Sequence, residues 1–320
     1  MKLGKLLMLP VIACASLPLA SCLHKDICYD HTHRADIYVD FDWQKAQDAA
    51  PTSMLTYYFP ADGDMLEVTV PGRDGGMVAL PVGSDYCAIC INGDNTYWAG
   101  MRHTDDPDRF ELYTKDAEQL ESYALRTRVL PRAAGTENER IAKTPGMIWS
   151  NRQDNVTIPF DAEGDTHITF YPEEAVCHYT VDVYDIKNIQ YLHGSAIDAT
   201  ISGMAEGYLH GKHTTTDVHV TMPFTLRPSD DSSSLHGEFL TFGECDSVKT
   251  SHNITLYMYL TDGTKWYHTF DVTSQVTGAP DPTHVHIIIS GLDLPKPISE
   301  GGGFVPDVTE WHDVNINLSM

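Results

Sequence analysis

Hydrophobic and polar residues alternate along much of the chain, a pattern typical of half-buried β-strands. The clearest case is residues 35–43, in which Ala35, Ile37 and Val39 alternate with acidic residues and Tyr38. Hydrophobic runs then recur at a spacing of roughly ten residues, separated by turn-forming Pro, Gly and Asp. The strands expected in the first half are 35–43, 54–59, 65–70, 77–80 and 86–91. This spacing predicts an all-β sandwich rather than alternating strands and helices.

The second half of the chain repeats this style. Asp262-Gly263 lies between two hydrophobic runs and predicts a β-hairpin turn. The strands expected here are 156–160, 168–171, 176–183, 218–226, 238–242, 254–260, 265–270 and 284–290. The pattern predicts two β-sandwich domains in tandem, at residues 22–155 and 156–320.

Residues 101–152, between the halves, differ in composition. They include nine basic and nine acidic residues, so their net charge is zero. We interpret them as a solvated connection, with a short helix at 116–125 and an exposed loop at 132–140. The sequence leaves open whether Arg132 or Arg140 is cleaved on maturation.

Residues 1–21 have the pattern of a bacterial lipoprotein signal peptide. Lys2 and Lys5 precede an apolar stretch too short to span a bilayer, and Leu-Ala-Ser-Cys follows at 19–22. We expect Cys22 to carry lipid, such as palmitate, that anchors the protein in the outer membrane. The Lys25-Asp26 pair resembles the surface-export signal of Bacteroidales lipoproteins, which implies the cell surface. The sequence does not decide which leaflet holds the lipid.

Composition narrows the functional classes. The chain has 320 residues, is 42% hydrophobic and carries a formal charge of −24, so it repels the phosphate backbone of nucleic acids. Five cysteines remain once Cys14 and Cys22 are set aside, an odd number that fits no complete disulfide framework. Cys87 and Cys90 fall in an expected strand, where residues three apart face opposite sides. We therefore expect buried thiols rather than a disulfide or a zinc site.

Motifs of catalysis are missing from the sequence. It contains no G-x-S-x-G, H-E-x-x-H, phosphate loop or dinucleotide fingerprint, so we expect neither an enzyme nor a cofactor. We interpret the pairs His31/His33 and His284/His286, and the cluster of His210, His213 and His219, as scattered surface and cross-strand histidines rather than a metal site, because a zinc site needs three or four converging ligands and the sequence gives only pairs. The sequence does not decide whether the His pairs bind a metal. The Asn- and Asp-rich loops 62–64 and 92–95 are interpreted as turns rather than calcium sites.

The order of segments resembles a family of Bacteroidales surface lipoproteins within the FimB-like fimbrial anchor and fimbrillin superfamily. The matching pieces are the lipobox at Cys22, the strand 35–42, Leu80-Pro81-Val82-Gly83, the turn 91–96 and Thr136-Glu137-Asn138-Glu139-Arg140, followed by 178–181, 202–205, 260–263, 270–273 and 294–297. The resemblance implies two transthyretin-like, Greek-key β-sandwich domains and a role as fimbrial anchor or minor pilus subunit in adhesion. It brings no catalytic residues.

A sandwich subunit can join another by strand addition, in which an extended segment pairs with an open sheet edge. The expected partners are fimbrillin-like shaft or accessory subunits. Val314, Ile316 and Leu318 alternate with polar residues near the C-terminus and form a possible subunit-joining strand. The same residues can instead complete the sheet of the second domain, and the sequence does not show which edge is open.

Two other functional classes remain. One is a surface lipoprotein that binds host or dietary glycans on exposed aromatic side chains, with Trp98, Trp149, Trp266 and Trp311 as candidates. Core packing also explains a Trp on a strand, so the exposure of these residues discriminates between the two. The other class is a metal-dependent hydrolase that uses the His pairs.

Overall fold

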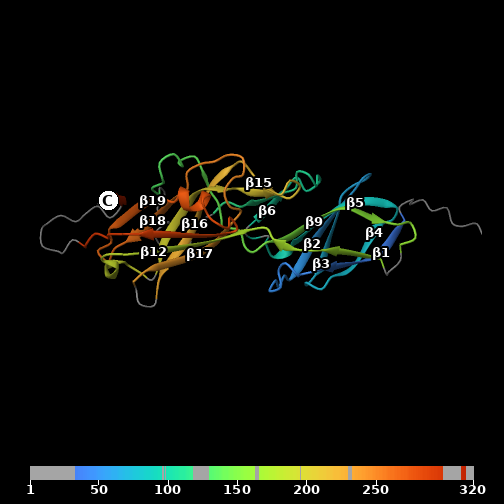
Figure 1. Ribbon diagram of the computed structural model, residues 1–320, viewed down its shortest axis with the longest axis horizontal. Coiled ribbons are helices and arrows are strands. Elements are labelled where there is room, and N and C mark those ends of the chain that lie inside the picture. Colours follow the sequence, from blue (N-terminus) through green and yellow to red (C-terminus); the bar gives the residue numbers. More distant parts are fainter. Residues whose placement is uncertain are drawn as a thin grey trace, which may run out of the picture. The chain divides into compact units, whose positions relative to one another are not determined.

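The computed structural model describes residues 33–95, 97, 99–117, 130–162, 166–194, 196–229, 233–297 and 311–314. Strands dominate the described chain (Figure 1), and its helices are the short α1 (Thr273–Thr277) and the 3-10 turns η1 (Gly93–Asn95) and η3 (Ile189–Tyr191). The predicted all-β class is therefore confirmed. The described strands all belong to one unit of the chain, Arg34–Met320.

The N-terminal strands form two sheets. The first has the order β10-β1-β4, from β1 (Arg34–Phe41), β4 (Gly76–Pro81) and β10 (His167–Phe170). The second has the order β11-β9-β5-β2-β3, from β2 (Ser53–Pro60), β3 (Leu66–Pro71), β5 (Ser84–Asn92), β9 (Trp149–Ile158) and β11 (Glu173–Glu174). Both sheets contribute to one core, which contains Ile37 and Val39 of β1 beside Tyr58 and Tyr86. The alternation in β1 thus buries the face that the sequence indicates.

The C-terminal half contains a nine-stranded sheet of order β20-β12-β17-β16-β13-β18-β19-β21, with β8 paired to β16 outside this path. Ile287 of β20 and Leu256 of β18 come from opposite halves of that order but share one core. The sheet therefore curls into the two layers of a sandwich. Its strands are β8 (Arg140–Ile141), β12 (Cys177–Tyr184), β13 (Ile197–Ala205), β16 (His219–Pro228), β17 (Leu235–Thr241), β18 (Asn253–Tyr259), β19 (Lys265–Asp271), β20 (His284–Ser290) and β21 (Trp311–Asp313).

A small four-stranded sheet joins strands from both halves, and we call it the bridging sheet. Its order is β15-β14-β7-β6, from β6 (Ala99–Arg102), β7 (Glu111–Thr114), β14 (Gly207–Leu209) and β15 (Thr214–Thr215). Leu112 of β7, and Phe110 just before this strand, pack in a cluster with Ile91 of β5 and Phe242. The described part of 101–152 is therefore not a solvated connection, because hydrophobic contacts and strand pairing bury much of it.

The expected loop at 132–140 also differs from the prediction. Ala133 and Thr136 are buried, and the Arg132 guanidinium donates hydrogen bonds to the carbonyls of Thr136 and Glu139. Arg140 lies in β8, which pairs in parallel with β16. Of the expected helix at 116–125, Asp116 bridges to Ala142 instead, and 118–125 lies outside the described residues.

The predicted domain boundary at 155/156 falls inside β9. The chain continues through β10, which pairs with β1, and β11, which pairs with β9, before β12 enters the C-terminal sheet. The sheet partners thus change after β11. The division into two separately folding domains stays a prediction.

Residues 1–32, with the expected signal peptide and Cys22, lie outside the described residues. Among the residues that are described, no helix has the length and apolar character needed to cross a membrane.

Glu206, just after β13, joins the C-terminal sheet to the bridging sheet by charge. Its side chain is 8% exposed, and its two carboxylate oxygens accept hydrogen bonds from Arg102 at 3.0 Å and Arg140 at 2.8 Å. Burial alone would raise the pKa of Glu206, but the two guanidinium groups outweigh burial and hold that pKa below its usual range.

We expect Glu206→Gln to lower the free energy of unfolding by about 2 kcal/mol, because two half-buried guanidinium groups lose their charged acceptor. Urea unfolding of the purified protein measures this change. Lys45→Gln is the control, since the exposed Lys45–Glu173 pair should contribute less than about 1 kcal/mol. Equal losses in both variants would contradict a special role for Glu206.

Candidate functional site

The strands β16 and β17 pair at only two register positions, Arg227 with His236 and Pro228 with Leu235. Beyond these positions β17 stays paired with β12, whereas β16 stays paired with β13. The two strands separate because each follows a different layer of the C-terminal sandwich.

Among the described strands, this separation leaves two edges without a pairing partner. From Gly237 to Thr241, β17 pairs with β12 on one side and with no other described strand on its second side. On β16, the pairing with β8 stops at Thr221, so residues 222–226 lack a described strand partner on the same side. Open edges present backbone N–H and C=O groups that an added strand can use.

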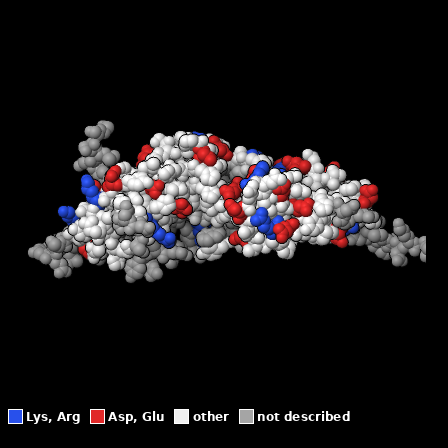
Figure 2. All heavy atoms as spheres, turned by 60° about the horizontal axis from the view of Figure 1, so that its bottom comes forward, with Lys and Arg blue, Asp and Glu red and all other residues white. Residues whose placement is uncertain are grey.

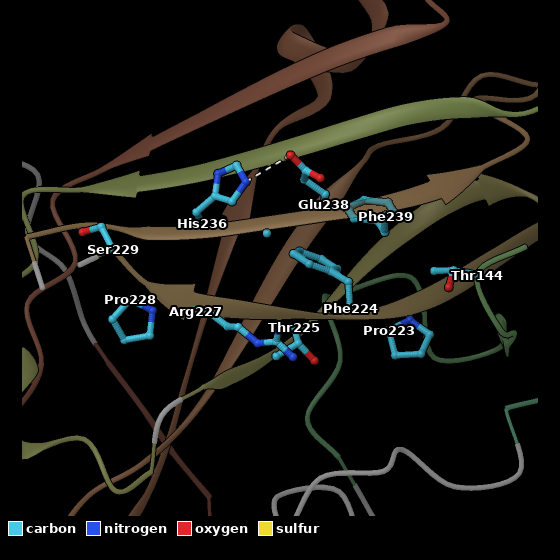
Figure 3. A pocket seen from close by; sticks show the side chains of 11 residues that line it. Thr144, Pro223, Phe224, Thr225, Arg227, Pro228, Ser229, His236, Glu238 and Phe239 are labelled. Carbon is cyan, nitrogen blue, oxygen red and sulfur yellow. Dashed lines mark hydrogen bonds and ion pairs between the residues drawn. The ribbon is translucent and has the colours of Figure 1, made fainter. Parts of the chain in front are cut away.

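A groove of about 800 Å³ lies between these edges, and we call it the β16/β17 groove. Figure 3 shows Phe224 and Phe239 between the two strands, where their rings stack with centroids 4.5 Å apart. Phe224 and Phe239 are each 8% exposed. Thr225 and Arg227 of β16, and Glu238 of β17, add polar groups to the walls. The groove thus has an apolar floor and polar sides.

Gly237 sets the width at the closed end of the groove. A Cβ atom at this position would lie 2.7 Å from the carbonyl oxygen of Thr225, closer than a van der Waals contact allows. A larger residue would therefore push β16 and β17 apart, and glycine keeps them close.

A row of histidines and carboxylates covers the exposed face of the sheet beside the groove. Asp182 of β12 lies between His236 of β17 and His286 of β20, with nitrogen–oxygen distances of 2.8 and 2.7 Å. His178 and His284 stack beside them with parallel rings 4.9 Å apart. Adjacent strands thus place side chains that are distant in sequence on one surface.

Both ring nitrogens of His236 face carboxylates, Asp182 and Glu238, so the protonated ring can donate twice. The hydrogen bond to Asp182 outweighs desolvation and raises the pKa of His236 above its ordinary value. Burial alone would raise the pKa of Asp182, but the hydrogen bonds from His236 and His286 hold it below its usual range. These hydrogen bonds therefore favour the positively charged form of His236 and the negatively charged form of Asp182.

The structure shows where two histidines of β20 and two cysteines of β5 lie. His284 and His286 do share one exposed face of β20, as their spacing indicates. The described residues contain no group of three or more His, Cys, Asp or Glu side chains that could hold a metal ion. Cys87 and Cys90 face different hydrophobic clusters as free thiols, which confirms the predicted strand geometry. Burial raises the pKa of the Cys87 thiol to about 12.

The tryptophans that suggested sugar platforms pack against hydrophobic clusters. Trp149 contacts the N-terminal core, Trp266 contacts the C-terminal core, and Trp311 packs with Tyr257. Each of the three is partly buried, and Trp98 lies outside the described residues. Their positions favour core packing over glycan binding.

The possible subunit-joining strand is described only in part. β21 runs parallel to β19, and the amide of Val314, 7% exposed, donates to the carbonyl of Tyr267 at 3.0 Å. Val314 therefore belongs to the C-terminal core. Ile316 and Leu318 lie outside the described residues, and their role stays a prediction.

Sequence reasoning did not find the residues of the β16/β17 groove. Both strands are expected from the sequence. The point at which their pairing stops does not change the alternation of hydrophobic and polar residues, so the sequence does not indicate it. Gly237 inside a strand is the one visible hint, because glycine in a strand often marks a close backbone approach.

Comparisons with known proteins place the fold. Residues 21–225 match the model of a family described as a domain of unknown function, DUF5119. No curated protein matches the chain.

The fold is similar to that of a candidate adhesin from Bacteroides ovatus, with 20% identity, a TM-score of 0.61 and coverage of 87% of this chain and 99% of that chain. The fimbrial anchor protein Mfa2 from Porphyromonas gingivalis matches with 13% identity, a TM-score of 0.47 and coverage of 81% and 91%. The similarity to the Bacteroides ovatus protein shows a shared fold.

We expect the pKa of His236 to lie above its ordinary value of 6.5 in the folded protein and to fall in Asp182→Asn. Because folding raises the pKa of His236, its protonated ring stabilises the folded protein. This contribution is complete at pH values below the pKa of the same histidine in the unfolded chain, and it is lost as pH rises through its pKa in the folded protein. Histidine titration by NMR measures the shift, with Asp293→Asn as the control because Asp293 pairs with Lys187. An unchanged His236 pKa in Asp182→Asn would refute the assignment.

Proposed function

The chain belongs to the DUF5119 family, and we propose that it is a lipid-anchored cell-surface protein that acts as a fimbrial anchor or minor pilus subunit in adhesion. Its partners in this proposal are fimbrillin-like shaft or accessory subunits. The observation that carries the proposal is the pair of open strand edges at the β16/β17 groove. The fold shared with a candidate adhesin and the sequence resemblance to fimbrial anchors support it.

Strand addition fits the chemistry of the groove. An extended segment of a partner can form main-chain hydrogen bonds along 237–241 of β17 or 222–226 of β16. Alternate side chains of that segment can contact the apolar floor made by Phe224 and Phe239, and the others can reach Arg227 or Glu238. Main-chain bonds would give affinity, and the floor would select apolar side chains at every second position.

The edge at β20 is a weaker candidate for the same role. The side-chain amide of Gln275 accepts from the backbone N–H of Ile288 at 2.8 Å and donates to its carbonyl at 3.0 Å. This side chain occupies the hydrogen-bonding groups that a partner strand would need. Along 222–226 and 237–241, the described side chains form no such pair of hydrogen bonds with the edge.

Lipid on Cys22 would fix the base of the anchor in the outer membrane, and β1 begins only a short way along the chain at Arg34. The open edges lie far along the sequence from Cys22, on β16 and β17. Location at the cell surface and the absence of enzymatic activity remain predictions of this proposal.

We expect a photo-reactive amino acid at Thr225, which is exposed in the groove, to crosslink on intact cells to a fimbrillin-like subunit. Mass spectrometry of the captured protein identifies the attached chain. The same label at Ile288, on the edge capped by Gln275, is the control and should give no such product. Crosslinking of pilus subunits at Ile288 but not Thr225 would place assembly at β20 instead.

We expect Cys22→Ala to abolish labelling by radioactive palmitate and to release the protein from the membrane fraction, because lipidation needs the thiol. Fractionation with immunoblotting measures the release. Cys28→Ala, six residues further along the sequence, is the matched control and should leave both unchanged. Membrane retention of unlabelled Cys22→Ala would overturn the lipid anchor while leaving the groove proposal intact.

A further inference from the structure

The strand β20 lies at one end of the nine-stranded sheet, and its outer edge is a place where another strand could pair. Among the described strands, β20 pairs only with β12. Its residues 284–290 are His-Val-His-Ile-Ile-Ile-Ser, without the Lys, Asp, Glu or Pro that often protect an edge strand. By contrast, the edge strand β3 of the five-stranded sheet contains Glu67 and Pro71. The β20 edge therefore needs a different protection.

The pairing with β12 uses every second residue of β20. The amide of His178 on β12 donates to the carbonyl of Thr283 at 2.7 Å, and in a parallel pair such bonds recur at every second residue. Odd-numbered residues of β20 therefore direct their N–H and C=O groups toward β12. Even-numbered residues, among them His286 and Ile288, direct theirs outward.

Gln275 of α1 closes this outer edge at Ile288. Its side-chain oxygen accepts from the Ile288 N–H at 2.8 Å, and its side-chain nitrogen donates to the Ile288 carbonyl at 3.0 Å. A carboxamide carries both a donor and an acceptor, as a peptide group does. Gln275 thus takes the place that a residue of a neighbouring strand would occupy.

The helix that carries Gln275 is fixed to the body of the sandwich. Val272, just before α1, and Val276 within it are buried in the C-terminal core. The Thr273 hydroxyl accepts a hydrogen bond from the amide of His252 at 2.9 Å. A side chain on such a support loses little conformational freedom when it binds the edge.

A second copy of this chain matches the backbone pattern of the uncapped edge. In an antiparallel pair of two β20 strands related by a two-fold axis, residue 286 of each copy can lie opposite residue 288 of the other. Both residues direct their N–H and C=O groups outward, so each opposed pair can exchange two hydrogen bonds. The Ile288 side chain, 50% exposed, would then pack across the new strand pair.

We propose that Gln275 closes an edge that otherwise pairs with a second copy of this chain. The cap keeps β20 single, so that strand addition is directed to other edges. This inference concerns contacts between copies of the chain and does not depend on the role in pili.

Charge between two copies opposes this pairing. The chain carries a formal charge of −24, and acidic side chains predominate among the charged groups on the face that Figure 2 displays. Two copies therefore repel each other. Association through the β20 edge should strengthen as salt screens this repulsion.

Sedimentation equilibrium of the purified full chain tests the proposal. All samples carry Cys22→Ala, so that lipid at this position cannot cause association. We expect the chain with Gln275 intact to keep the mass of a monomer. Gln275→Leu should move toward about twice that mass as its concentration rises, because leucine has a similar size but no hydrogen bond to offer the edge. Thermal melting verifies that each variant is folded.

Two further variants separate pairing at β20 from other causes of association. Ile288→Pro in the Gln275→Leu chain should restore the monomer, because proline lacks the outward N–H and is tolerated on an edge strand. Gln44→Leu replaces an exposed glutamine of the N-terminal half and should leave the mass unchanged. This control shows whether an added surface leucine is itself enough for association.

Hydrogen exchange measured by NMR checks the cap in the chain with Gln275 intact. The Ile288 amide should exchange slowly because Gln275 binds it, whereas the outward amide of His286, for which the described residues supply no acceptor, should exchange quickly. In dilute Gln275→Leu, the Ile288 amide should exchange at least about tenfold faster.

A folded Gln275→Leu chain that stays monomeric at every concentration would overturn the proposal. Association that persists unchanged with Ile288→Pro, or that is equally strong in Gln44→Leu, would place the contact elsewhere and refute it too. Equal association with Gln275 intact would show that this side chain does not close the edge.

Discussion

The C-terminal half depends on how the backbone hydrogen bonds of β16 are distributed. One edge of this strand pairs with β13 over most of its length, whereas the other is divided between β8 near its start and β17 at its end. Because β17 must also stay in register with β12, β16 and β17 cannot remain paired as the sheet curls. The curl that encloses the core therefore leaves the open edges of the groove. Fold and candidate function follow from one constraint.

Charge holds the two halves together at the bridging sheet. Glu206 is nearly buried and pairs with two arginines from the segment between the halves. A buried carboxylate requires such partners, because an unpaired charge in the interior is strongly destabilising. The segment between the halves is thus fixed to the end of β13 by the carboxylate of Glu206.

The sequence predicts strands well where one face is buried and the other is exposed, as in β1 and β20. It misses β13, because all nine of its residues are buried and it includes Asp198, Thr200 and Ser202 rather than an alternating pattern. The strands of the bridging sheet are two to four residues long, too short for periodicity to register. The groove forms where the pairing of two strands ends. The hydrophobic pattern of a single sequence predicts the strands but not which strands pair or where their pairing ends.

The segment 142–144 connects the bridging sheet to the β16/β17 groove. Thr144 lines the groove. The segment is held from both sides, because the buried Ala142 donates its amide to the carbonyl of Thr221 on β16 while the amide of Lys143 donates to the carbonyl of Lys115. A wall restrained in this way favours recognition of a partner strand without a large ordering cost. Changes at Ala142 would therefore alter the groove although this residue does not line it, because they would displace the wall that carries Thr144.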